Sequence, residues 1–161
     1  MIEYNRPIHQ VVIFLVLSTL IGFASNLVRT DSIPWIAAKL ETVESIDLSS
    51  AEPILVAISL DQAKDFFDNG VLFVDARDEG YYEAGHIKGA MRNGFLMELV
   101  FNIEEKQSKN DPLVVYCGDP GCGDSEDLAY DLKDSGFMQL YVFQGGWVEW
   151  SEASYPSEAG E

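Results

Sequence analysis

The chain has 161 residues and carries 27 acidic against 10 basic side chains, which gives a formal net charge of −17. Hydrophobic residues make up 47% of it, which excludes a disordered acidic chain and supplies one core. Beyond residue 110 the only basic side chain is Lys133, so we expect no nucleic-acid partner. Two cysteines, Cys117 and Cys122, are too few for a disulfide scaffold or a closed zinc site, and we expect neither a metal nor a cofactor.

The first predicted element is a transmembrane helix. No formal charge occurs between Arg6 and Arg29, and about 20 apolar helical residues span a bilayer core of roughly 30 Å. We therefore expect residues 8–28 to cross the lipid bilayer once and the soluble domain to be extracytoplasmic, because a short signal-anchor most simply keeps its own end in the cytoplasm. A signal peptide cleaved near residues 22–24 and a buried helix of a soluble domain are the alternatives.

The remaining chain is expected to form a linker, one α/β domain and a tail. From Ile54 onward, short apolar runs alternate with helical stretches, which is typical of a mostly parallel sheet. The resulting parts are a tail and transmembrane helix at 1–28, a juxtamembrane linker at 29–53, the domain at 54–152 and an acidic tail at 153–161.

The pattern predicts five strands and five helices in the domain. The strands are expected at 56–60, 71–75, 90–92, 113–116 and 140–143, and the helices at 61–68, 77–84, 95–106, 126–135 and 147–150. Asp61 and Ser125 are the expected N-caps of two helices, and Trp147 is expected to pack in the core. Ligands bind at the carboxyl ends of parallel strands, where Asp75 and Cys117 stand.

The most informative segment is the glycine-rich loop that follows the strand at 113–116. Backbone N–H groups of such a loop can surround a sulfur, and the positive end of the next helix favours thiolate over thiol. Cys117 is therefore a candidate nucleophile, with a passive apolar cysteine as the alternative. Cys122 is a candidate resolving thiol that could react with Cys117, and it could form a disulfide with it if the loop brings their Cα atoms within about 7 Å.

Four motifs occur in the order DAR (75–77), EAGHIKGA (83–90), VVYC (114–117) and GGW (145–147). Together they resemble the rhodanese (sulfurtransferase) homology domain over residues 56–152. The resemblance implies an α/β fold with a central five-stranded, mainly parallel sheet flanked by helices. It also implies that the loop cysteine takes sulfur from a donor as a persulfide and passes it to a thiol acceptor, each of them a small molecule or a protein.

The resemblance also assigns residues to the site. Cys117 matches the persulfide-forming cysteine, Asp75 and Arg77 match an ion pair that holds a turn beside it, and His86 matches the histidine of a Gly-His-Ile turn. We expect His86 to be bonded to nearby backbone, with a proton shuttle as the alternative. The loop residues that match the cradle of the cysteine are Gly118, Asp119, Pro120, Gly121, Gly123, Asp124 and Ser125.

Two departures from the family pattern narrow the function. The loop contributes Asp119 and Asp124 and no basic residue, so it opposes thiolate formation and repels anions, and we expect poor use of thiosulfate as donor. Position 123 is Gly where a related phosphatase loop needs Arg to hold phosphate, which excludes that activity. The leading hypothesis is a membrane-anchored sulfurtransferase or persulfide carrier. A catalytically silent protein-binding module and a two-cysteine thiol redox protein are the alternatives.

Overall fold

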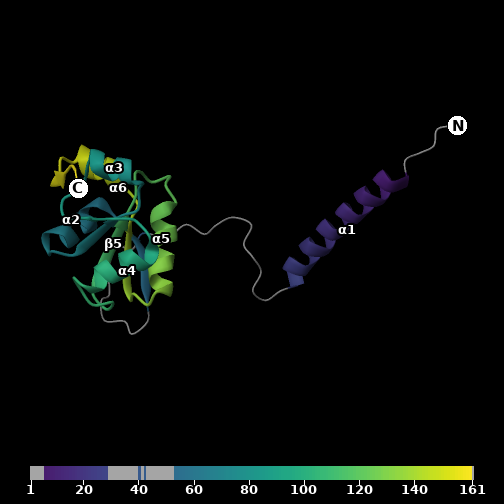
Figure 1. Cartoon of the computed structure of the whole chain (residues 1–161), viewed down its shortest axis with the longest axis horizontal. Helices are drawn as coiled ribbons and strands as arrows, with labels where there is room; N and C mark the ends of the chain where they lie inside the picture. The colour runs from purple at the N-terminus through teal and green to yellow at the C-terminus, as the bar shows by residue number, and fades with distance from the viewer. Residues whose placement is uncertain (1–5, 29–39, 41, 43–52, 161) are drawn as a thin grey trace. The chain divides into compact units, whose positions relative to one another are not determined.

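The computed structural model describes residues 6–28, 40, 42 and 53–160, which form parts of two compact units (Figure 1). Helix α1 (Arg6–Val28) belongs to the first unit, and its segment Ile8–Asn26 is long and apolar enough to cross a membrane. A signal sequence near the N-terminus meets the same criterion. The linker expected at 29–53 falls, apart from residues 40, 42 and 53, outside the described residues.

The second unit is built on a five-stranded parallel sheet, as predicted. Its strands lie in the order β1 (Ile54–Ile58), β6 (Gln139–Phe143), β5 (Pro112–Tyr116), β2 (Leu72–Asp75) and β4 (Met91–Arg92). All four neighbouring pairs are parallel. The fold class expected from the sequence is therefore confirmed.

Helices cover both faces of this sheet, because alternate strand residues point to opposite sides. Along β5, Leu113 and Val115 pack with α4 (Leu96–Glu104) and α5 (Asp124–Asp134). Val114 and Tyr116 face the other way and pack with α2 (Leu60–Asp68) and α6 (Gly146–Glu152). Figure 1 shows α2 and α5 on opposite sides of β5. The sheet is therefore buried on both faces.

A cluster of aromatic rings forms the core beneath α2 and α6. Trp150 is fully buried, and its ring lies 5.2 Å from that of Phe67 and 5.1 Å from that of Tyr155 between centroids. Trp147, expected in the core, packs against this cluster but remains only partly buried. The two indoles are three residues apart and lie on the same side of α6, but Trp147 stands in the first turn, at the start of the helix.

Two helices begin earlier than predicted. Ser59 caps α2 in place of Asp61, because Ser59 and Gln62 exchange hydrogen bonds between side chain and backbone at 2.9 and 3.4 Å. Helix α5 begins at Asp124 with Gly123 as its N-cap, so Ser125 is buried in the first turn and does not cap the helix. The N-cap predictions for Asp61 and Ser125 were therefore wrong.

The acidic C-terminal segment packs on the domain through a short antiparallel pair of strands. Strand β7 (Ser157–Glu158) pairs with β3 (His86–Ile87), which lies within the predicted turn after α3 (Glu79–Ala84). Trp150 Nε1 donates to the carbonyl of Pro156 at 3.0 Å. The backbone of the last described residues therefore pairs with the segment that carries His86.

Candidate functional site

Three loops meet at the carboxyl edge of the sheet and place Cys117 beside a cavity. Cys117 follows β5 directly, Arg77 follows β2, and Trp147 follows β6 at the start of α6. The cysteine is only 3% exposed, but it lines a cavity of about 360 Å³. The other lining residues are Arg77, Asp78, Tyr81, Gly118, Asp119, Cys122, Asp124, Trp147 and Val148.

The backbone of Cys117 is fixed by the start of α6. Its carbonyl accepts a hydrogen bond from the amide of Trp147 at 2.8 Å, and the carbonyl of Gly118 accepts one from Val148 at 2.9 Å. Gly146 has φ +60°, and a Cβ at that position would lie 2.5 Å from the carbonyl oxygen of Cys117. The GGW motif is thus explained by a close backbone approach that glycine alone permits.

The glycine-rich loop folds back and joins Cys117 to Cys122 in a disulfide, with the two Cα atoms 6.1 Å apart. The turn is held by Asp119, whose carbonyl accepts from the amide of Cys122 at 3.1 Å and whose Oδ1 accepts from Gly121 at 2.7 Å. These two amides therefore bond to Asp119 and not to the sulfur. The disulfide left open by the sequence is formed in this structure.

Carboxylates dominate the charge around the sulfurs. Oδ2 of Asp124 lies 3.5 Å from Sγ of Cys122 and 3.9 Å from Sγ of Cys117. After reduction, this negative charge would disfavour a thiolate on either cysteine. The two sulfurs and the carboxylate lie close enough to act as three ligands for a thiophilic metal ion, but only in the reduced protein.

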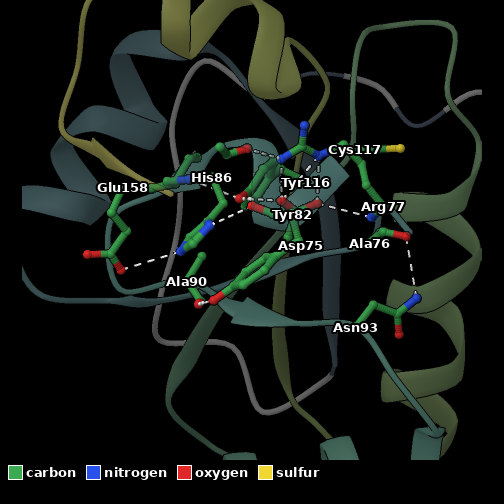
Figure 2. Close-up of polar contacts among 12 residues, drawn as sticks. Asp75, Ala76, Arg77, Tyr82, His86, Ala90, Asn93, Tyr116, Cys117 and Glu158 are labelled. Carbon is green, nitrogen blue, oxygen red and sulfur yellow. Dashed lines mark hydrogen bonds and ion pairs between the residues drawn. The ribbon is translucent and has the colours of Figure 1, made fainter. Parts of the chain in front are cut away.

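A buried ion pair supports the wall of the cavity (Figure 2). Arg77 donates from Nε to Oδ1 of Asp75 at 2.9 Å and from Nη2 to Oδ2 at 2.6 Å, and Nη2 also donates to the carbonyl of Gly85 at 2.7 Å. Tyr116 donates its hydroxyl to Oδ2 of Asp75 at 2.7 Å. Burial, together with the charge of Asp75, raises the pKa of Tyr116 far above its ordinary value, so this hydroxyl stays a donor.

His86 lies away from the cavity and does not line it. Its Nδ1 is 2.8 Å from the carbonyl of Tyr82, and its Nε2 is 3.4 Å from Oε1 of Glu158. Figure 2 shows His86 and Glu158 on the opposite side of the Asp75 network from Cys117. A hydrogen bond from the amide of Gly89, followed by the contacts with His86, lowers the pKa of Glu158. These contacts match the expected backbone-bonded histidine, not a proton shuttle at the sulfur.

Several residues of the site were missed from the sequence. Asp78 and Tyr81 line the cavity from α3 and its N-cap, and Val148 lines it from α6. These residues could have been predicted from their positions just after the DAR and GGW motifs, because residues that follow the ends of parallel strands lie at the same edge of the sheet. No motif precedes Glu158, so its contact with His86 outside the cavity could not have been predicted in this way.

Comparison with known proteins identifies the family. Residues 59–153 match the model of the rhodanese-like domain. A protein named thiosulfate sulfurtransferase GlpE from Ectopseudomonas mendocina is 31% identical over 106 residues, which cover 65% of this chain and 91% of that protein. GlpE from Pseudoalteromonas translucida is 33% identical over 101 residues, covering 61% of this chain and 90% of that protein.

Solved structures agree with this assignment at the level of the fold. A rhodanese-like domain from Anabaena has a TM-score of 0.52 at 24% identity and covers 63% of this chain and 76% of its own. A protein from Bacillus halodurans has a TM-score of 0.54 at 21% identity, with 63% and 74% covered. The family model spans more than half of the chain and coincides with the four motifs, so this protein belongs to the rhodanese-like family.

Proposed function

We propose that the protein is a membrane-anchored sulfurtransferase or persulfide carrier that uses Cys117. The observation that carries this proposal is the place of Cys117, which follows the central strand β5 and lines a cavity in a rhodanese-like domain. Its relatives are named sulfurtransferases. A nucleophile at a strand end, with its backbone fixed on two sides, is suited to repeated attack and release.

The proposed reaction has two exchange steps at sulfur. The reduced thiolate of Cys117 attacks the sulfane sulfur of a donor R–S–SH, the donor S–S bond breaks, and the donor leaves as a thiolate that takes up a proton. Cys117 then carries the sulfur as a persulfide. The thiolate of an acceptor attacks this outer sulfur, takes it as a new persulfide, and returns Cys117 as a thiolate.

Thiosulfate is proposed to be a poor donor for this site. Thiosulfate is a dianion, and the carboxylates of Asp78, Asp119 and Asp124, which line the cavity, would repel it. Arg77 is the one basic side chain among the described residues that line the cavity, and it is already paired with Asp75. The donor that fits better is a neutral or protein-bound sulfane sulfur.

The disulfide favours a second candidate function, that of a thiol redox protein. The two functions are connected by one reaction. If the thiolate of Cys122 attacks the inner sulfur of the Cys117 persulfide, the disulfide forms and hydrosulfide leaves. Cys122 would then end each loading event, and a reductant such as a second thiol would be needed before the next one.

Intact mass after loading separates the candidates. A reduced Cys122→Ser variant treated with a persulfide donor should gain about 32 Da, and Cys117→Ser should gain nothing at the site. The wild type should release sulfide and end about 2 Da below its reduced mass. If Cys122→Ser gains no sulfur, the transfer function is wrong. The redox function then stands if mild oxidation still removes about 2 Da and needs both cysteines. If neither sulfur loading nor oxidation of both cysteines is observed, the remaining hypothesis is a catalytically silent protein-binding module.

The anchor and its orientation are part of the proposal. The length and composition of Ile8–Asn26 support a single membrane span, with the domain on the extracytoplasmic side. Alkaline carbonate extraction should leave the full chain in the membrane fraction, and a carboxyl-terminal reporter active only outside the cytoplasm should be active. Release by carbonate would overturn the anchor, and an inactive reporter with a stable fusion would overturn the orientation.

A further inference from the structure

The cavity beside the two cysteines has an uncompensated negative charge. Asp78, Asp119 and Asp124 line it, and no Lys or Arg of residues 53–160 forms an ion pair with any of them. Arg77 adds no net positive charge, because Asp75 beneath it accepts hydrogen bonds from its Nε and Nη2 in a buried ion pair. A molecule that enters the cavity therefore meets three carboxylates.

The other walls of the cavity are aromatic and apolar. The side chain of Tyr81 is 65% exposed, and Val148 is 41% exposed. The guanidinium carbon of Arg77 lies 5.2 Å from the ring centroid of Trp147, so one face of this indole is already occupied. Tyr81 has no such partner among the described ring contacts, and an exposed phenol ring attracts ammonium groups.

These features define what kind of thiol can approach the sulfurs. An attacking thiolate is itself an anion, so three carboxylates slow its approach, and one of them lies 3.5 Å from a target sulfur. A positive charge on the same molecule, a few bonds from its sulfur, would turn this repulsion into attraction. The selectivity thus comes from the charge of the cavity, while the reaction comes from the cysteines.

We propose that the thiol partner of this site carries a positive charge next to its sulfur, as in an aminothiol or a cysteine flanked by Lys or Arg in a protein segment. This inference rests on the proposed function for the identity of the site, and it specifies the class of acceptor. Asp119 and Asp124 are its specificity-determining residues, with Asp78 completing the acidic lining.

Reduction of the disulfide by small thiols tests the charge preference without any sulfur transfer. The oxidised full-length chain in non-ionic detergent is mixed with cysteamine, 2-mercaptoethanol or 3-mercaptopropionate, whose thiolates differ by one unit of charge in turn. Each thiol attacks one sulfur to form a mixed disulfide, and a second thiol completes reduction. Rates are calculated per thiolate and divided by the rate of the same thiol with a neutral small disulfide, which removes intrinsic nucleophilicity.

The expected order is cysteamine, then 2-mercaptoethanol, then 3-mercaptopropionate, with each step about fivefold, the factor that one contact between unit charges near 4 Å in water provides. The spread should shrink at high salt, because the cavity is open to solvent. The double variant Asp119→Asn with Asp124→Asn should reduce the differences in rate between the three thiols. The control is the double variant Asp131→Asn with Asp134→Asn, which changes the net charge by the same amount on α5 but outside the cavity. It should leave the differences in rate between the three thiols unchanged.

Equal normalised rates for the three thiols, or equal compression by both double variants, would overturn the inference. If the cavity double variant does not fold, the salt dependence of the wild-type order decides alone. The result is independent of the loading experiment. If the rates follow the charge of the thiol but no persulfide forms, sulfur transfer is rejected and the class of thiol partner stands. If a persulfide forms but the rates do not follow the charge, the class of thiol partner is rejected and sulfur transfer stands.

Discussion

The buried pair of Asp75 and Arg77 makes the sharpest prediction about stability. Asp75 is fully buried and accepts hydrogen bonds from the amide, Nε and Nη2 of Arg77 and from the hydroxyl of Tyr116, at distances from 2.6 to 3.1 Å. Asp75→Asn keeps the shape but turns one acceptor oxygen into a donor. An amide NH₂ group would then face hydrogen-bond donors, and Arg77, only 7% exposed, would lose its counter-charge.

The expected cost is about 3–5 kcal/mol, the range for breaking a buried ion pair by removing one partner. This is a large share of the roughly 5–15 kcal/mol that stabilises a domain. The matched control is Asp68→Asn, which breaks the exposed pair of Lys64 and Asp68 within α2 and should cost less than about 1 kcal/mol. Both changes remove one carboxylate from one ion pair, so the contrast reports the burial of Asp75 together with its hydrogen bonds to Tyr116 and the Arg77 amide.

Urea unfolding of the full-length chain in detergent, followed by tryptophan fluorescence, measures both costs, since Trp150 is fully buried. Asp75→Asn combined with Arg77→Gln should recover at least about 0.5 kcal/mol relative to the sum of the single changes, because the second change removes the unpaired charge. A cost for Asp75→Asn within 1 kcal/mol of that for Asp68→Asn, or strict additivity in the double variant, would refute the account of the network.

Three further predictions address other parts of the domain. Gly146→Ala should destabilise it by more than about 2 kcal/mol in urea, while Gly70→Ala, also at positive φ but with no atom near the new Cβ, should cost only about 1. Tyr141→Phe should leave stability equal or higher in the same assay, because the buried hydroxyl has no partner among the described residues. The lowered pKa of Glu158 means that its contribution to stability is present above the unfolded pKa near 4.3 and is lost as the pH falls through the folded pKa. The protection of the Gly89 amide against hydrogen exchange, measured relative to the unfolded-chain rate at each pH, should therefore fall in acid, and Glu158→Gln should remove this pH dependence.

Sequence reasoning succeeded where local pattern and position determine structure. A short apolar run bounded by turn residues, such as 113–116, is typical of a buried strand, and a cysteine directly after a parallel strand stands at the carboxyl edge of the sheet. The capping errors at Asp61 and Ser125 have a different cause. Several polar residues near each helix start can act as caps, and at α2 the reciprocal hydrogen bonds of Ser59 and Gln62 decide in favour of Ser59.

The parts that escaped prediction depend on segments far apart in the chain. The cavity combines Tyr81 of α3 with Val148 of α6, and no periodicity links these positions. Strand β7 is two residues long in an acidic segment, so its pairing with β3 has no pattern of its own. The disulfide depends on a loop closure set by Asp119, which composition leaves open.

The order of the strands has a consequence for synthesis. Within the five-stranded sheet β1 bonds only to β6, which lies near the other end of the domain. On a ribosome, the apolar residues of β1 therefore emerge long before the strand that covers their edge, and the backbone of Cys117 lacks its anchor until α6 has been made. A nascent chain that stops before residue 139 would expose an unpaired strand, and the wall of the cavity beside Cys117 is finished only once residue 148 has been made.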